Sequence, residues 1–299
     1  MTEDETTRSD GGISAIVDRS DDADVAASEE GSASDPTNAA EFVGEDLVIG
    51  YPSMDEPVID EESIEVPPGG VTALVGPNGS GKSTLLKGLA SQLDIDEGQV
   101  LVDGTEVRSL SSKELARRIG LLSQENTSPD SLTVEKMVAH GRYPHRGFFE
   151  TLTDEDREAI DEAIELAGID HLRERELGSL SGGQKQLAWI AMVLAQDTDV
   201  VMLDEPTTFL DLHHQLEVME IVEMLRERDI TVVVVLHDLQ QAARHADYMI
   251  ALRDGEIIDW GPSKDVVTEQ LLADVFRIEA HVSVGPTGPE ITPLRPLNE

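Results

Sequence analysis

A run of nine residues in the first third of the chain has the composition and spacing of a phosphate-binding loop. It matches the pattern G-x-x-x-x-G-K-[ST] and consists of Gly76, Pro77, Asn78, Gly79, Ser80, Gly81, Lys82, Ser83 and Thr84. Its glycines let backbone N–H groups turn inward around phosphate oxygens, at the positive end of the helix that follows. Lys82 is placed to reach the β and γ phosphates of ATP, and the Ser83 hydroxyl to ligate Mg²⁺. The alternative is an ordinary glycine-rich turn, but the pattern occurs by chance in only about 1% of chains of this length.

Two adjacent carboxylates, Asp204 and Glu205, follow an apolar run over residues 200–203. Asp204 is suited to hold Mg²⁺, directly or through water, and Glu205 to accept a proton from the water that attacks the γ phosphate. Because 61 of the 299 residues are acidic, such a pair on its own would be more typical of a solvated turn. The phosphate-binding loop favours the catalytic interpretation.

A second candidate anion site lies at the start of a predicted helix. After Leu180 come Ser181, Gly182, Gly183 and Gln184, which offer hydroxyl and N–H donors at a helix N-terminus. No lysine stands where Lys82 stands in the first loop, so this segment cannot hold a nucleotide alone. Taken singly, it is equally compatible with a capped helix start.

These residues must be positioned by alternating strands and helices. A short apolar strand over residues 71–75 precedes the loop, and a helix over residues 83–92 follows it. The continuous apolar runs 200–203 and 231–236 are typical of strands buried on both faces of a parallel sheet, with a helix over about 212–228 between them.

Other segments predict different layers around that core. Residues 42–50 and 58–66 favour edge strands of an antiparallel layer, and residues 100–104 favour a further hairpin. The region from about 125 to 196 is predicted to be helical almost throughout. One of its helices should begin at the hydroxyl cap Thr153 and end at Gly168.

Composition excludes several classes of function. The chain has 22 basic residues and a net charge of −39, so its surface should repel the phosphate backbone of nucleic acids. It has no cysteine, which rules out disulfides and thiolate chemistry. Only six of the basic residues are lysine, and such an acidic, lysine-poor surface resembles those of halophilic cytoplasmic proteins. An ordinary acidic protein is the alternative.

The chain ends are predicted to lie outside the main domain. Residues 1–41 carry 12 acidic side chains and few large apolar ones, which favours a disordered acidic tail. No apolar run reaches the ~20 residues that span a bilayer, and the N-terminus lacks the features of a signal peptide. We therefore expect a cytoplasmic protein whose link to a membrane comes through a partner.

The three motifs together resemble the nucleotide-binding subunit of ABC transporters. Gly76–Thr84, Leu180–Gln184 and Leu203–Pro206 occur in the order and spacing of that family, and the LSGGQ sequence is specific to it among P-loop proteins. The resemblance covers about residues 42–280 and leaves 281–299 as a C-terminal extension. It implies an α/β fold: a P-loop NTPase core of mainly parallel sheet, an antiparallel β layer and an inserted helical subdomain at about 125–196.

The resemblance also implies roles for single residues. Gln124 matches the glutamine that contacts Mg²⁺ and the attacking water, and His237 the histidine that hydrogen-bonds the γ phosphate. Asp211 lies in a segment that matches the loop by which each subunit contacts the nucleotide site of the other subunit. Tyr51 is the candidate for stacking on adenine, with a simple packing role as the alternative.

The partners are implied by the same resemblance. Two copies should stack head to tail, with ATP between the loop of one copy and Ser181–Gly183 of the other. Closure should pass through Gln124 and the helical subdomain to a membrane-spanning permease, on the cytoplasmic face of the membrane, and indirectly to an extracytoplasmic substrate-binding protein.

Three stretches resemble the subfamily that imports ferric siderophores, haem and cobalamin: His140–Arg146, Pro206–Gln215 and Val235–Arg244. Tyr143 and Arg146 are candidates for coupling to the permease, although a solvated loop would also accommodate them. The ferric-siderophore branch is favoured, with a cobalamin or haem importer as the alternative. A soluble ABC ATPase is disfavoured, because the chain lacks coiled coils, a second nucleotide domain and a basic surface.

Overall fold

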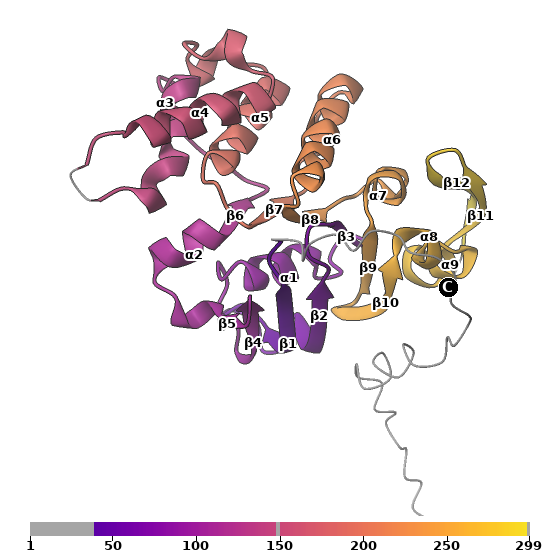
Figure 1. Cartoon of the computed structure of the whole chain (residues 1–299). Coiled ribbons are helices and arrows are strands. Elements are labelled where there is room, and N and C mark those ends of the chain that lie inside the picture. The colour runs from indigo at the N-terminus through magenta and orange to yellow at the C-terminus, as the bar shows by residue number, and fades with distance from the viewer. Residues whose placement is uncertain (1–38, 148–149, 298–299) are drawn as a thin grey trace, which may run out of the picture.

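The computed structural model describes residues 39–147 and 150–297 of the chain. The predicted acidic tail, residues 1–41, lies almost wholly outside this part. Figure 1 shows the helices α3, α4 and α5 at the upper left, the antiparallel sheet below and a C-terminal hairpin at the right. None of the helices within the described ranges is long and apolar enough to cross a bilayer.

The main sheet has six strands in the order β10-β9-β3-β8-β7-β6. Its strands are β3 Val71–Val75, β6 Ile119–Leu122, β7 Val200–Asp204, β8 Thr231–Val235, β9 Tyr248–Arg253 and β10 Glu256–Pro262. All neighbours pair in parallel except β9 and β10. Every residue of β3, β7 and β8 is buried, because helices and a second sheet cover both faces.

A second, antiparallel sheet has the order β2-β1-β4-β5. Its strands are β1 Phe42–Ile49, β2 Ile59–Val66, β4 Glu97–Val102 and β5 Thr105–Glu106. The prediction that β1 is an edge strand was wrong, since β4 pairs with its second side and places Val102 opposite Phe42. Only β2 of the two predicted edge strands is an edge.

Helices fill the space between and around the sheets. They are α1 Lys82–Leu89, α2 Ser112–Arg118, α3 Val134–Val138, α4 Asp154–Leu166, α5 Gly182–Leu194, α6 Leu212–Glu227, α7 Leu239–His245, α8 Ser263–Val266 and α9 Glu269–Phe276. α1 buries Leu85, Leu86 and Leu89 in a core shared by the two sheets. It ends three residues before the predicted position, and Ser91 then takes a left-handed conformation with φ 55°.

The helical region follows β6 and ends before β7. In it, α3, α4 and α5 enclose apolar side chains that are continuous with the core on the far face of the main sheet. α4 begins at the predicted cap: Thr153 accepts a hydrogen bond from the Asp156 N–H, and Asp156 accepts one from the Thr153 N–H. Gly168, with φ 67°, follows the end of the helix.

The chain ends in a hairpin of β11 Ile278–Gly285 and β12 Gly288–Pro296. The predicted fold class is confirmed: a mainly parallel sheet, an antiparallel layer and inserted helices.

Candidate functional site

The loop between β3 and α1 has a backbone shape that only glycine tolerates. Gly76 has φ 151°, and a Cβ there would lie 2.2 Å from the Leu252 carbonyl oxygen. Gly81, with φ 99°, is the N-cap of α1. The first N–H groups of that helix therefore face the concave side of the loop, where anions are attracted.

Lys82 is folded back over this loop. Its Nζ donates hydrogen bonds to the carbonyl oxygens of Gly76 and Pro77, both at 2.9 Å. Burial lowers the pKa of Lys82, and the carboxylates of Glu205 and Asp204 act in the opposite direction. The ammonium group thus lies within the loop, where it donates mainly to backbone carbonyl oxygens and could exchange them for phosphate oxygens.

Ser83 and Asp204 form an oxygen-rich pair beside Lys82. Ser83 Oγ donates to Asp204 Oδ1 at 2.8 Å, while Asp204 Oδ2 is buried and has no hydrogen-bond partner in the described part of the chain. Burial raises the pKa of Asp204, and the bond from Ser83 partly opposes this. A hydroxyl and an orphaned carboxylate oxygen fit a hard cation such as Mg²⁺, so these residues suit the predicted metal.

Glu205 is contacted from both sides. Gln124 Nε2 donates a hydrogen bond to Oε2, and His237 Nε2 lies beside Oε1, each at 2.6 Å. The Glu205 side chain is only 8% exposed, whereas that of His237 is 40% exposed. Gln124, Glu205 and His237 follow the adjacent strands β6, β7 and β8. They meet at the carboxyl edge of the parallel sheet, which is where such sheets bind ligands.

A cavity of about 410 Å³ joins these groups. It is lined by Tyr51, Met54, Val58, Asn78, Gly79, Gly81, Lys82, Ser83, Thr84, Gln124, Glu205 and His237. Tyr51 OH lies 3.3 Å from Thr84 Oγ1, so this tyrosine is next to the loop. Met54 and Val58 were missed, and their only signal was their position in the turn that follows Tyr51.

The predicted residues of the second anion site, Ser181–Gln184, and Asp211 do not line this cavity. Ser181 caps α5, accepting from the Gln184 N–H at 3.2 Å while its own N–H donates to Gln184 Oε1. Asp211 caps α6 and accepts from the His214 N–H at 3.1 Å. That bond, with a contact to the His214 ring, lowers the pKa of Asp211. These residues therefore act locally as helix caps in the single chain.

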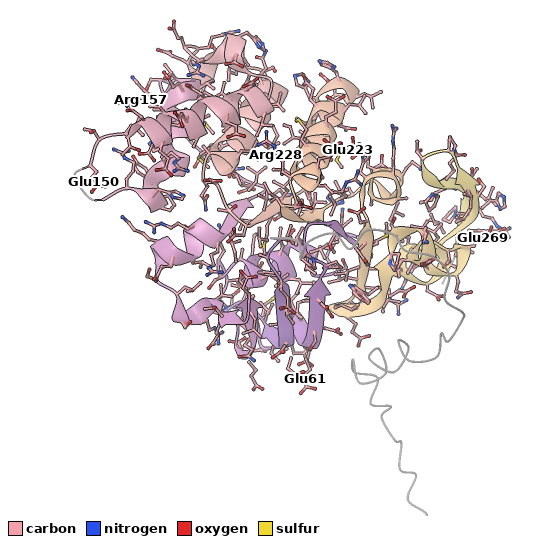
Figure 2. All side chains as sticks on the ribbon, in the orientation of Figure 1. Glu61, Glu150, Arg157, Glu223, Arg228 and Glu269 are labelled. Carbon is pink, nitrogen blue, oxygen red and sulfur yellow. The ribbon has the colours of Figure 1, made fainter. Side chains whose placement is uncertain are left out.

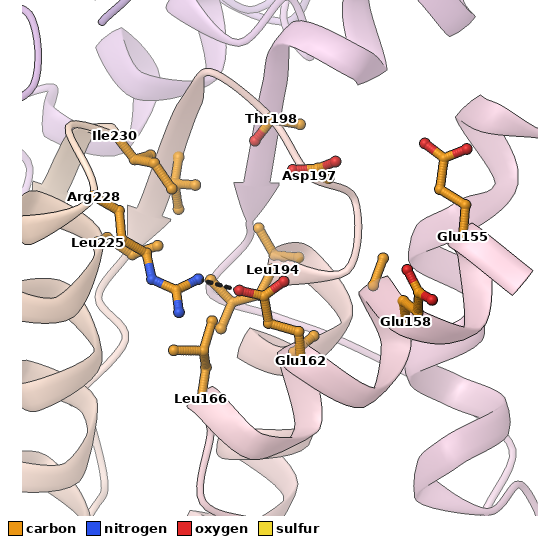
Figure 3. Close-up of a pocket in the computed structure, with 14 residues that line it drawn as sticks. Glu155, Glu158, Glu162, Leu166, Leu194, Asp197, Thr198, Leu225, Arg228 and Ile230 are labelled. Carbon is orange, nitrogen blue, oxygen red and sulfur yellow. Dashed lines mark hydrogen bonds and ion pairs between the residues drawn. The ribbon is translucent and has the colours of Figure 1, made fainter. Parts of the chain in front are cut away.

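A further cavity, of about 250 Å³, lies between α4, α5 and the end of α6 (Figure 3). Its wall includes Glu155, Glu158, Glu162 and Asp197, and Arg228 pairs with Glu162 across it at 2.5 Å. None of the site residues predicted from the sequence lines it.

Comparisons with known proteins agree with this geometry. The family model described as ABC transporter matches residues 59–208. The ferric enterobactin transport ATP-binding protein FepC of Escherichia coli (strain K12) is 44% identical over 260 residues, covering 86% of this chain and 95% of FepC. The iron(3+)-hydroxamate import ATP-binding protein FhuC of Bacillus subtilis (strain 168) is 42% identical, covering 81% and 90%. The dimeric structure of MJ0796, a bacterial ABC transporter cassette, matches with a TM-score of 0.66 at 27% identity, covering 74% and 98%.

Proposed function

The chain belongs to the ABC transporter family as an ATP-hydrolysing subunit, and from this premise we propose that it energises the import of ferric siderophores. Two relatives above 40% identity serve this class of substrate, ferric enterobactin in one case and iron(3+)-hydroxamate in the other. Both matches extend over most of each chain, including the helical region that lies between β6 and β7.

The hydrolytic step is assigned to Glu205, Gln124 and His237. Glu205 accepts the proton of the attacking water at one of its carboxylate oxygens, and Gln124 orients that water. His237 turns its Nε2–H toward the γ phosphate. The 2.6 Å contacts of Glu205 with both neighbours support this assignment, since they hold all three side chains within reach of one reacting atom.

The cofactor requirement is assigned to the loop and the buried carboxylate. Lys82 leaves the carbonyl oxygens of Gly76 and Pro77 to contact the phosphates of ATP. Ser83 and Asp204 would hold Mg²⁺, which would neutralise charge on the phosphate oxygens. The unpartnered Oδ2 of Asp204 supports the metal assignment. Tyr51, at the mouth of the cavity, is placed to stack on adenine.

A second copy of the chain completes the site. Ser181, Gly182, Gly183 and Gln184 offer donors at the start of α5 but stand outside the cavity that Lys82 lines. A head-to-tail dimer brings them, and Asp211, to the ATP of the partner. The dimeric relative MJ0796 supports this arrangement.

The helical region is assigned the contact with a permease. Tyr143, 57% exposed, lies beside Arg142, whose guanidinium is buried and donates to Asp156 Oδ1 and to the Ala195 carbonyl oxygen. This buried anchor holds Tyr143 and Arg146 on the surface. The permease keeps the chain on the cytoplasmic face of the membrane and couples it to a substrate-binding protein.

Transport by the reconstituted complex tests the substrate. Membrane vesicles holding the permease and this chain should hydrolyse ATP faster when their binding protein carries a ferric catecholate or ferric hydroxamate. Cobalamin and haem are the controls. Stimulation by cobalamin or haem alone would overturn the siderophore assignment and leave the ATPase assignment intact.

A further inference from the structure

Gln240 joins the turn that carries His237 to the C-terminal hairpin. It lies in the first turn of α7, three residues after His237. Its Nε2 donates to the Pro289 carbonyl oxygen at 3.0 Å, and its Oε1 accepts from the Ile291 N–H at 2.9 Å. One side-chain amide thus pairs with a C=O and an N–H of β12, as a neighbouring strand would.

The hairpin also touches the backbone of α7. Gly288, the first residue of β12, has φ 121°, and a Cβ there would lie 3.0 Å from the Ala243 carbonyl oxygen. On the other strand, Glu269 of α9 accepts from the Val282 N–H at 3.2 Å and lies 2.9 Å from His281 Nδ1. The hairpin is therefore attached to the body of the protein on both sides and can serve as a fixed support.

The opposite side of the same turn is held by Gln241. Its Nε2 donates to Gln215 Oε1 of α6 at 2.9 Å, and its Oε1 accepts from Thr207 Oγ1 at 3.4 Å. Asp238 caps the turn by accepting from the Gln240 and Gln241 N–H groups at 2.7 and 3.2 Å. His237 thus precedes a turn that is clamped between the hairpin and α6.

The His237 side chain is partly open to solvent and lies against Glu205, so its position is set largely by the backbone of the turn that carries it. We propose that Gln240 is a positioning residue, which uses the C-terminal hairpin to hold His237 against Glu205. The inference rests on the proposed role of His237 in hydrolysis. Since a displacement of about 1 Å can cost up to about 10²-fold in rate, a loosened turn should slow hydrolysis and leave nucleotide binding at the loop unchanged.

The first test uses the full-length chain in the assembled transporter. Gln240→Met keeps the length of the side chain and its helix propensity but removes both hydrogen bonds. Gly288→Ala pushes β12 from α7 without altering any side chain near the site. We expect kcat to fall about tenfold in each, with KM for MgATP and affinity for a non-hydrolysable ATP analogue within about twofold. Arg244→Ala, an exposed change on the same helix, is the control and should keep kcat.

The second test is a double-mutant cycle. If Gln240 acts through His237, then Gln240→Met should cause no further loss in a His237→Ala background. An equal loss of rate in both backgrounds, or an unchanged kcat in Gln240→Met, would overturn the proposal. Normal hydrolysis by His237→Ala would instead show that His237 has no part in the reaction, and the inference would fail for that separate reason.

Discussion

Glu205 Oε1 and His237 Nε2 lie 2.6 Å apart, although the two residues come from the ends of different strands, β7 and β8. The other oxygen of Glu205 accepts from Gln124. Each carboxylate oxygen has two lone pairs, so these contacts leave Glu205 able to accept a proton from a water molecule in the cavity, as proposed above.

The first prediction concerns the charge of Glu205. Glu205→Gln should keep ATP affinity and lose about 10²–10⁴-fold in turnover, because the general base is removed while its shape is kept. The variant should also accumulate as an ATP-bound dimer, measured by size-exclusion chromatography with ATP. Glu220→Gln, the same change at an exposed position of α6, should leave both properties unaltered. Near-normal hydrolysis in Glu205→Gln would exclude this carboxylate from the mechanism.

The second prediction concerns the composite site. Ser181→Arg and Lys82→Ala chains should each be inactive alone, the first because arginine blocks the start of α5 and the second because the phosphates lose a cation. Mixed, they should form dimers with one intact site, made from Lys82 of one copy and Ser181 of the other. Such dimers should retain one nucleotide, measured by equilibrium binding. Two tightly held nucleotides in a Ser181→Arg homodimer would contradict the head-to-tail arrangement.

Much of the site could be predicted because its motifs are local. The loop around Lys82 needs positive φ at its glycines, and the capping pairs that begin at Thr153 and Ser181 span four residues each, so their signals are contiguous in the sequence. Their positions follow from short-range geometry.

The remaining features depend on pairing between distant segments. Nothing near Phe42 in the sequence shows that β4 will pair with the second side of β1. Prolines at 289, 293 and 296 disfavour strand structure. The sequence therefore did not predict β12, nor the contacts that Gln240 makes with it. Met54 and Val58 line the cavity because β2 begins beside the loop. Such long-range relationships leave little trace in a single sequence.

The third prediction follows from the raised pKa of Asp204. A buried carboxylate with a raised pKa costs stability once it ionises. The cost is absent below the unfolded-state pKa near 3.8 and is fully present above the folded-state pKa. Without nucleotide or metal, Asp204→Asn should therefore have the higher Tm at pH 7, and the difference should shrink as the pH falls through the folded-state pKa.

Thermal melting from pH 7 to below pH 3.8 checks this, with and without MgATP. A ligand that binds only the folded state raises the Tm of the protein. The Tm of the wild-type chain should therefore rise with MgATP more than the Tm of Asp204→Asn. A pH-independent difference between the two chains would contradict a titration of Asp204. An equal increase in Tm with MgATP in the two chains would show that Asp204 is not a ligand of the metal.

The last prediction concerns salt. Residues 42–299 carry 49 acidic and 20 basic side chains, and the exposed carboxylates are spread over the molecule. Figure 2 shows Glu61 at the antiparallel sheet, Glu150 beside the helical region and Glu269 on the C-terminal side. Repulsion among these charges should loosen the fold in dilute buffer, where the Debye length is about 30 Å at 0.01 M against about 3 Å at 1 M. We expect Tm to rise steeply into molar KCl.

Deletion of residues 1–41 tests whether the dependence of Tm on salt comes from this acidic segment or from residues 42–299. Because most of the charge excess belongs to residues 42–299, this deletion should barely change the dependence of Tm on KCl. If the deletion abolished the dependence, the tail alone would be responsible. A Tm that stayed flat from 0.1 to 2 M KCl in both chains would defeat the comparison with halophilic proteins, since screening of a net charge of this size must then contribute little to the stability of the fold.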